Sequence, residues 1–173
     1  MAQVAEALDY AHTQRVTHRD IKPANIMLIH AGQIKITDFG IAHLATSSQT
    51  QTGVVKGTPY YMSPEQFSGQ KVDGRSDIFS LGTTMFQLLT GTLPFYAESP
   101  ALLMNQIMNF PHPNPRAINP RVIPAIVGIL DKALEKDRDN RYQTAKDLAR
   151  DLFRLDKRIM TVLRKDRTVI RSG

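Results

Sequence analysis

Residues 18–25 are the first group of side chains in this sequence that could do chemistry. They read His-Arg-Asp-Ile-Lys-Pro-Ala-Asn, which places the carboxylate of Asp20, the ammonium of Lys22 and the amide of Asn25 close together. A carboxylate that accepts a hydroxyl proton, a cation beside the transferred group and an amide oxygen for Mg²⁺ are what phosphoryl transfer requires. Polar turns also contain such residues, so this segment alone does not decide the function.

A second group follows a short distance along the chain. The tripeptide Asp-Phe-Gly at residues 38–40 comes directly after two apolar runs, 26–29 and 34–36, that are joined by four residues including a glycine. This pattern is typical of a β-hairpin. Because a hairpin returns the chain to its starting point, we expect Asp38 to lie beside Asn25. The two groups together are far more specific than either alone.

The elements that must position these groups are mostly helical. Apolar residues recur at helical spacing through most of the chain, interrupted by glycine, proline and short polar turns. Residues 41–62 are polar and show no period, which indicates a functional or disordered loop. The sequence therefore predicts a mainly α protein with one small β-hairpin. We expect helices at residues 2–13, 75–90, 99–109, 121–135 and 143–154, the last with apolar spacing that continues to about residue 163.

Composition excludes several classes of protein. The chain has 173 residues, 42% of them hydrophobic and 22% charged, which is typical of one globular domain. No apolar run is long enough to span a membrane, and residues 1–20 lack the apolar core of a signal peptide. The absence of cysteine excludes disulfides, thiolate zinc sites and a cysteine nucleophile. We therefore expect a cytoplasmic location, although a longer parent protein could be anchored in a membrane.

The positive charge is concentrated at the end of the chain. Residues 154–173 contain seven basic and two acidic residues, a net +5 out of a total of +6. Basic tails of this kind are usually solvated, and this one lacks the interleaved aromatic residues typical of nucleic-acid binding. An anionic membrane surface stays open as a partner of the tail.

In their order along the chain, the motifs resemble the eukaryotic-like (Hanks-type) serine/threonine protein kinases, and the bacterial branch in particular. The resemblance implies the C-terminal lobe of a kinase domain over residues 1–153, with a basic helical extension or tail at 154–173. Besides residues 18–25 and 38–40, it rests on Gly-Thr-Pro-Tyr-Tyr-Met-Ser-Pro-Glu (57–65), Asp-Ile-Phe-Ser-Leu-Gly (77–82), Gly-Thr-Leu-Pro-Phe (91–95) and Asp-Asn-Arg-Tyr (139–142).

The resemblance implies a role for each residue of the active site. Asp20 is expected to be the catalytic base and Lys22 to contact the γ-phosphate of ATP. Asn25 and Asp38 are expected to hold Mg²⁺ (or Mn²⁺) between the phosphates. Thr58 is expected to form a hydrogen bond near Asp20, as in kinases that phosphorylate serine and threonine of protein substrates.

Five further residues have structural roles in the family. The ring of His18 is expected to pack against Phe39 rather than to bind a metal. Asp77 resembles the buried aspartate that accepts hydrogen bonds from the backbone of the catalytic loop. Glu65 and Arg141 resemble the ion pair that ties the activation segment to the late helices.

The resemblance also implies regulation by phosphorylation. Residues 41–56 take the place of the activation loop, and Arg19 resembles the arginine that receives its phosphate. Thr50 and Thr52 are the phosphorylation sites that we expect, because a phosphothreonine carries enough charge to order a loop against an arginine. An unmodified loop is the alternative.

The half of the family's domain that covers the nucleotide is not recognisable in this sequence. It contains no Gly-x-Gly-x-x-Gly loop and no Val-Ala-Ile-Lys strand. We therefore expect the chain to lack an N-terminal lobe, or to need a partner that covers the cleft face. Two readings stay open: a kinase fragment that contains the catalytic residues, and a non-catalytic, kinase-like module that binds proteins.

Overall fold

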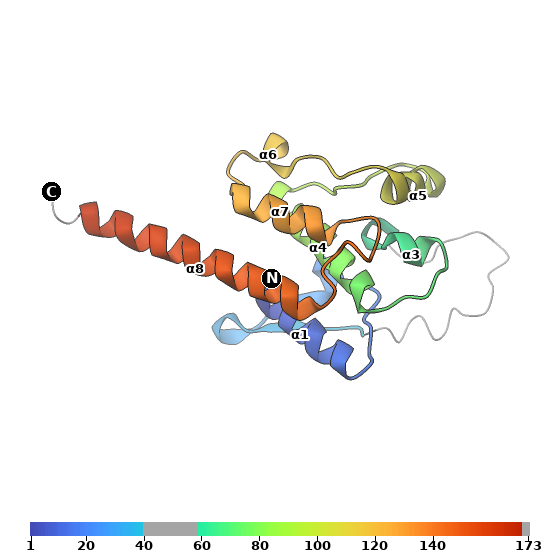
Figure 1. Cartoon of the computed structure of the whole chain (residues 1–173), viewed down its shortest axis with the longest axis horizontal. Helices are drawn as coiled ribbons and strands as arrows, with labels where there is room; N and C mark the ends of the chain where they lie inside the picture. Colours follow the sequence, from blue (N-terminus) through green and yellow to red (C-terminus); the bar gives the residue numbers. More distant parts are fainter. Residues whose placement is uncertain (40–58, 171–173) are drawn as a thin grey trace.

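The computed structural model describes residues 1–39 and 59–170 of the chain (Figure 1). It is mainly helical with one antiparallel pair of strands, which confirms the fold class expected from the sequence. Short 3₁₀ turns occur at Pro23–Asn25, His30–Gly32 and Pro59–Tyr61. The helices and strands are α1 (Ala2–Thr13), β1 (Ile26–Leu28), β2 (Ile34–Ile36), α3 (Pro64–Phe67), α4 (Gly74–Thr90), α5 (Pro100–Asn109), α6 (Pro115–Ile118), α7 (Pro124–Ala133) and α8 (Ala145–Ile170).

Helix α4 forms the centre of the structure. Its residues from Ser76 to Phe86 are all buried, and a helix that is buried on every side must be enclosed by other elements. Helices α1, α6, α7 and α8 all contact it. The Asp73 side chain caps its start by accepting from the backbone N–H of Arg75 at 3.0 Å, and the helix ends where Gly91 turns the chain at a φ of 78°.

The hairpin pairs β1 with β2 in the register Ile26 to Ile36 and Leu28 to Ile34. The isoleucines of β2 are half-buried and pack against the core, whereas β1 exposes Met27 and Leu28. This arrangement brings residue 25, before β1, and residue 37, after β2, to the same end of the hairpin. The two candidate catalytic segments therefore meet there.

Helix α8 is longer than the spacing of its apolar residues indicates. Leu148 and Leu152 are buried against the core, but Met160 is already 48% exposed. The helix continues past residue 163, to which the apolar spacing extends, as far as Ile170, and it projects away from the other elements (Figure 1). Among the residues that the structure describes, no helix combines the length and apolar character that a membrane crossing needs.

Helix α7 begins later than the expected residue 121. Pro124 occupies its first turn and Ile123 is extended at the N-cap, because the residue before a proline avoids helical geometry. Residues 120–122 instead form a turn, and the short helix α6, which was not predicted, ends before it at Ile118. Asn114 caps α6 by accepting from the backbone N–H of Arg116 at 2.9 Å.

Candidate active site

Lys22 and Asn25 converge on the side chain of Asp20, in the loop between α1 and β1. The Nζ of Lys22 donates to Oδ2 of Asp20 at 2.7 Å. The amide nitrogen of Asn25 donates to the same carboxylate oxygen at 3.1 Å and to the backbone carbonyl of Asp20 at 2.8 Å. The loop therefore holds a carboxylate between a cation and an amide donor, and leaves the carboxylate partly open to solvent.

Local sequence explains why the loop takes this shape. Pro23 starts a 3₁₀ turn that ends at Asn25, and its fixed φ suits the first position of such a turn. Ile21 is completely buried and anchors the loop to the core. Asn25 is only 5% exposed, and two bonds to Asp20 fix its amide. Both bonds use the amide nitrogen, so the amide oxygen is the atom of this side chain that is suited to bind a metal.

The segment around Asp38 lies beside this loop. The backbone N–H of Thr37 donates to the carbonyl of Asn25 at 3.0 Å, while the carbonyl of Thr37 is bonded to Nε2 of His18 at 2.8 Å. The ring of His18 packs on Phe39 with their centroids 4.6 Å apart. Asp38 itself is exposed, with a φ of 59° that is unusual for a residue other than glycine.

Asp77 of α4 binds the backbone of the loop between α1 and β1. Its carboxylate is completely buried and accepts from the backbone N–H groups of His18 at 2.8 Å and Arg19 at 2.7 Å. His12 supplies a third contact, with Nε2 2.7 Å from Oδ2 of the aspartate. His12 was not among the site residues predicted from the sequence, although a polar ring on the buried face of an apolar helix was a signal that could have singled it out.

Gly74, at the start of α4, has no side chain, and the His12 ring packs in the space that a side chain would fill. A Cβ built at this glycine would lie 2.5 Å from Nδ1 of His12. A change from glycine to alanine in a helix normally stabilises it. Here we expect Gly74→Ala to lower the free energy of unfolding by about 1–3 kcal/mol, because the ring must leave its contact with Asp77.

Chemical denaturation measures this effect. The double variant His12→Ala/Gly74→Ala serves as the control, because removal of the ring removes the clash. We expect the double variant to lose less stability than the sum of the two single variants. A Gly74→Ala protein at least as stable as the wild type would contradict the packing described for His12.

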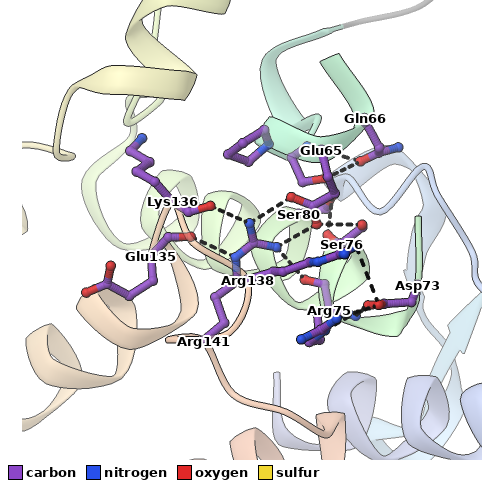
Figure 2. A network of polar contacts seen from close by, with 12 residues as sticks. Glu65, Gln66, Asp73, Arg75, Ser76, Ser80, Glu135, Lys136, Arg138 and Arg141 are labelled. Carbon is purple, nitrogen blue, oxygen red and sulfur yellow. Dashed lines mark hydrogen bonds and ion pairs between the residues drawn. The ribbon is translucent and has the colours of Figure 1, made fainter. Parts of the chain in front are cut away.

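A buried ion pair joins α3 to the segment after α7. The guanidinium of Arg141 donates to both carboxylate oxygens of Glu65, at 2.7 and 2.8 Å, and both side chains are at most 4% exposed. Figure 2 shows the other groups that form hydrogen bonds with Glu65 and Arg141. They are the hydroxyl of Ser76, which donates to Glu65 at 2.6 Å, and the backbone carbonyls of Arg75, Glu135 and Lys136, which accept from Arg141 at 2.7–3.0 Å.

The environment of Glu65 sets the direction of its pKa. Burial raises the pKa of this carboxyl. The hydrogen bonds and charge of Arg141 and the hydroxyl of Ser76 lower it by more, so the pKa of Glu65 lies below its ordinary value of 4.5. A depressed pKa in the folded state means that ionised Glu65 contributes stability above its ordinary pKa. That contribution is lost as the pH falls through the folded pKa.

The structure thus places most of the expected site residues and brings several of them together. Asp20, Lys22, Asn25 and Asp38 lie around the meeting point of two loops, and Arg19 lies exposed beside them. Thr50, Thr52, Thr58 and Gly40 lie outside the described residues.

The side chains at this meeting point fit a magnesium ion. Asn25 offers an amide oxygen and Asp38 a carboxylate, and oxygen donors of this kind are the ligands that Mg²⁺ prefers. Within residues 1–39 and 59–170, no cluster of three or more His, Cys, Asp or Glu side chains could enclose a metal by itself. Two protein ligands suit an ion that takes its other ligands from nucleotide phosphates and water.

Comparison with known proteins decides the family. A profile described as the protein kinase domain matches residues 1–154. The chain belongs to the protein kinase family. It is 43% identical over 152 residues to a probable serine/threonine-protein kinase of Streptomyces coelicolor, covering 86% of this chain and 23% of that protein.

Two other bacterial kinases are similar to this chain over most of its length. The chain is 41% identical to the serine/threonine-protein kinase PknB of Mycolicibacterium smegmatis, over 90% of this chain and 25% of that protein. It is also 41% identical to PrkC of Bacillus subtilis, over 88% of this chain and 24% of that protein. The chain therefore spans about a quarter of the length of these relatives. The family assignment drawn from the sequence motifs is confirmed.

A solved structure has the same fold. A crystal structure of Rad53 in complex with AMP-PNP superimposes with a TM-score of 0.71 at 28% identity, over 86% of this chain and 37% of that one. The kinase-like fold expected from the sequence is thus confirmed.

Proposed function

We propose that this chain contributes the catalytic residues of a serine/threonine protein kinase, which transfers the γ-phosphoryl group of ATP to hydroxyl groups of protein substrates. The observation that carries the proposal is the convergence of Lys22 and Asn25 on the carboxylate of Asp20. The three groups are brought within hydrogen-bonding distance beside Asp38, as in-line phosphoryl transfer requires.

Each side chain has a definite task in this reaction. Asp20 orients the acceptor hydroxyl and accepts its proton as the hydroxyl oxygen attacks the γ-phosphorus. The bond from that phosphorus to the bridging oxygen breaks, and ADP leaves. Lys22 lies 2.7 Å from Asp20 and neutralises charge on the transferred group.

Asn25 and Asp38 are the residues that would hold Mg²⁺ or Mn²⁺. When bound, the ion neutralises charge on the phosphates of ATP. The contribution of the chain is to fix the ligands: Asn25 is buried and bonded to Asp20, and Asp38 is held next to it by the hairpin. Because Asn25 is bonded to Asp20 and would also hold the ion, it would link the position of the ion to that of the base.

The choice of serine and threonine acceptors rests on sequence. Lys22 and Pro23 in the catalytic loop and Thr58 before the Ser-Pro-Glu motif resemble serine/threonine kinases. The names of the relatives support this choice. Thr58 is proposed to donate a hydrogen bond near Asp20 and so to orient the acceptor.

Regulation is proposed to involve Arg19. The residue is exposed next to Asp20, where its guanidinium can meet a phosphate. Phosphorylation of Thr50 or Thr52 would add about −1.5 to −2 charge and draw the loop towards this arginine.

A second protein segment is proposed to cover the nucleotide. Strand β1, next to the catalytic loop, exposes Met27 by 50% and Leu28 by 75%, and adjacent exposed apolar side chains are typical of a contact surface. The covering segment is an N-terminal lobe or a partner. A non-catalytic, kinase-like module that binds a protein through this surface is the second candidate function.

Two finer points complete the proposal. We place the reaction in the cytoplasm, because it consumes ATP. The basic residues of α8 and the tail are proposed to favour an anionic membrane surface over nucleic acid. Binding to vesicles of phosphatidylserine that weakens steeply with salt would support this electrostatic contact.

A transfer assay tests the proposed activity. The chain is incubated with γ-labelled ATP, Mg²⁺ and a generic basic protein, alone and with a separately produced kinase N-lobe. The proposal predicts label on serine and threonine and none on tyrosine. A folded chain that binds the N-lobe but leaves the protein unlabelled would favour the non-catalytic module.

A further inference from the structure

The side chain of Gln66 connects two parts of the active site that are far apart in the sequence. Its Nε2 donates to the backbone carbonyl of Arg19 at 2.9 Å. Its Oε1 accepts from the backbone N–H of Ser63 at 3.0 Å and from the Ser63 hydroxyl at 3.1 Å. One amide thus joins the start of α3 to the residue that precedes Asp20. Figure 2 shows Gln66 beside Glu65 at this end of α3.

The contact with Arg19 explains why residue 66 is a glutamine. Gln66 and Ser63 form a capping box, in which a glutamate serves as well as a glutamine because only an oxygen is needed. The bond to a carbonyl oxygen needs a donor, which a carboxylate lacks. The cap alone would accept either residue, whereas the contact with the catalytic loop accepts only the amide.

Arg19 has an unfavourable backbone conformation that its neighbours must support. Its φ is 68°, in the left-handed region that costs free energy for any residue with a Cβ. Asp77 holds its N–H from one side at 2.7 Å, and Gln66 holds its carbonyl from another. That carbonyl belongs to the same peptide plane as the N–H of Asp20, so rotation of the plane moves the catalytic carboxylate.

We propose that Gln66 is a positioning residue that fixes the peptide plane between Arg19 and Asp20. It thereby couples the placement of α3 to the orientation of the catalytic carboxylate. This inference rests on the proposed kinase function for its effect on rate, but not for its effect on the geometry of the loop. Gln66 itself touches no reacting atom.

Two variants separate positioning from stability. Gln66→Glu keeps the oxygen that caps α3 and turns the contact with Arg19 into a repulsion between oxygens. Ser63→Ala is the matched control, because it weakens the cap and leaves the bond from Gln66 to Arg19. We expect Gln66→Glu to change the ¹H–¹⁵N shift of the Asp20 amide while the melting temperature stays near that of the wild type. We expect Ser63→Ala to lower the melting temperature and to leave the shift of the Asp20 amide near that of the wild type.

The same variants test the rate. The nucleotide site is first completed by adding an N-lobe. We then expect Gln66→Glu to lower kcat by about 10- to 100-fold, because a small misplacement of a catalytic group lowers the rate by about this factor. We expect the KM for ATP to change by less than about twofold. An unchanged Asp20 amide shift overturns the inference, as does a rate loss that only follows a loss of stability. A wild-type chain without activity would count against the proposed function, while the amide shift would still decide the role of Gln66.

Discussion

Asp20→Asn is expected to lower the rate of phosphate transfer by about 10²–10⁴-fold, the usual contribution of a general base. Asparagine keeps the size of the side chain and an oxygen for Lys22, so the loop retains most of its contacts. It cannot accept the proton of the acceptor hydroxyl. We therefore expect KM for ATP to change little, because the loss falls on the transition state.

Steady-state kinetics of the chain, with a separately produced kinase N-lobe added to complete the nucleotide site, measure this effect. Lys35→Met is a matched control, since Lys35 is exposed on β2 in the same hairpin but away from the meeting point of the loops. The control should retain the wild-type rate. An Asp20→Asn protein with the rate of the wild type would show that Asp20 does not act as the base.

Arg141→Met is expected to lower the free energy of unfolding by about 3–5 kcal/mol, because it leaves Glu65 buried without its cation. For a domain of this size the melting temperature should fall by about 10 °C. Glu65 would then be an unpaired buried carboxyl with a raised pKa. Acid should therefore restore part of the stability of the variant, whereas the wild type loses stability as Glu65 takes up a proton.

Calorimetry between pH 4 and 8 distinguishes this account from a general loss of packing. The double variant Glu65→Gln/Arg141→Met removes both charges, so it should be more stable than Arg141→Met at neutral pH and lack its recovery in acid. If Arg141→Met melts within 2 °C of the wild type, the ion pair does not anchor α3.

Local pattern explains which parts of the fold could be predicted. The strands 26–28 and 34–36, and helices α1, α4 and α5, follow from apolar periodicity and from clear stops such as Gly91 and Pro111. The hairpin in turn brought Asn25 and Asp38 to one end, which the spacing of the two motifs had already indicated.

Contacts between distant residues could not be predicted in the same way. His12 reaches Asp77 across 65 positions, and Gln66 reaches Arg19 across 47. Periodicity predicts neither partner, because the first contact depends on how α1 packs against α4 and the second on how α3 lies against the loop. The last turns of α8 were not predicted for another reason: the apolar spacing stops near residue 163, whereas the helix continues to Ile170.

A manganese titration tests the central claim, that the two loops form a metal–nucleotide site, most directly. Mn²⁺ with ATP is added to isotope-labelled chain, alone and with an N-lobe, and the broadening of backbone amide signals locates the ion. We predict that signals of residues 20–25 and 37–39 broaden first, that α7 is unaffected, and that Asp38→Asn abolishes the effect. Broadening confined to other parts of the chain, or unaltered in Asp38→Asn, would contradict the assignment of the site.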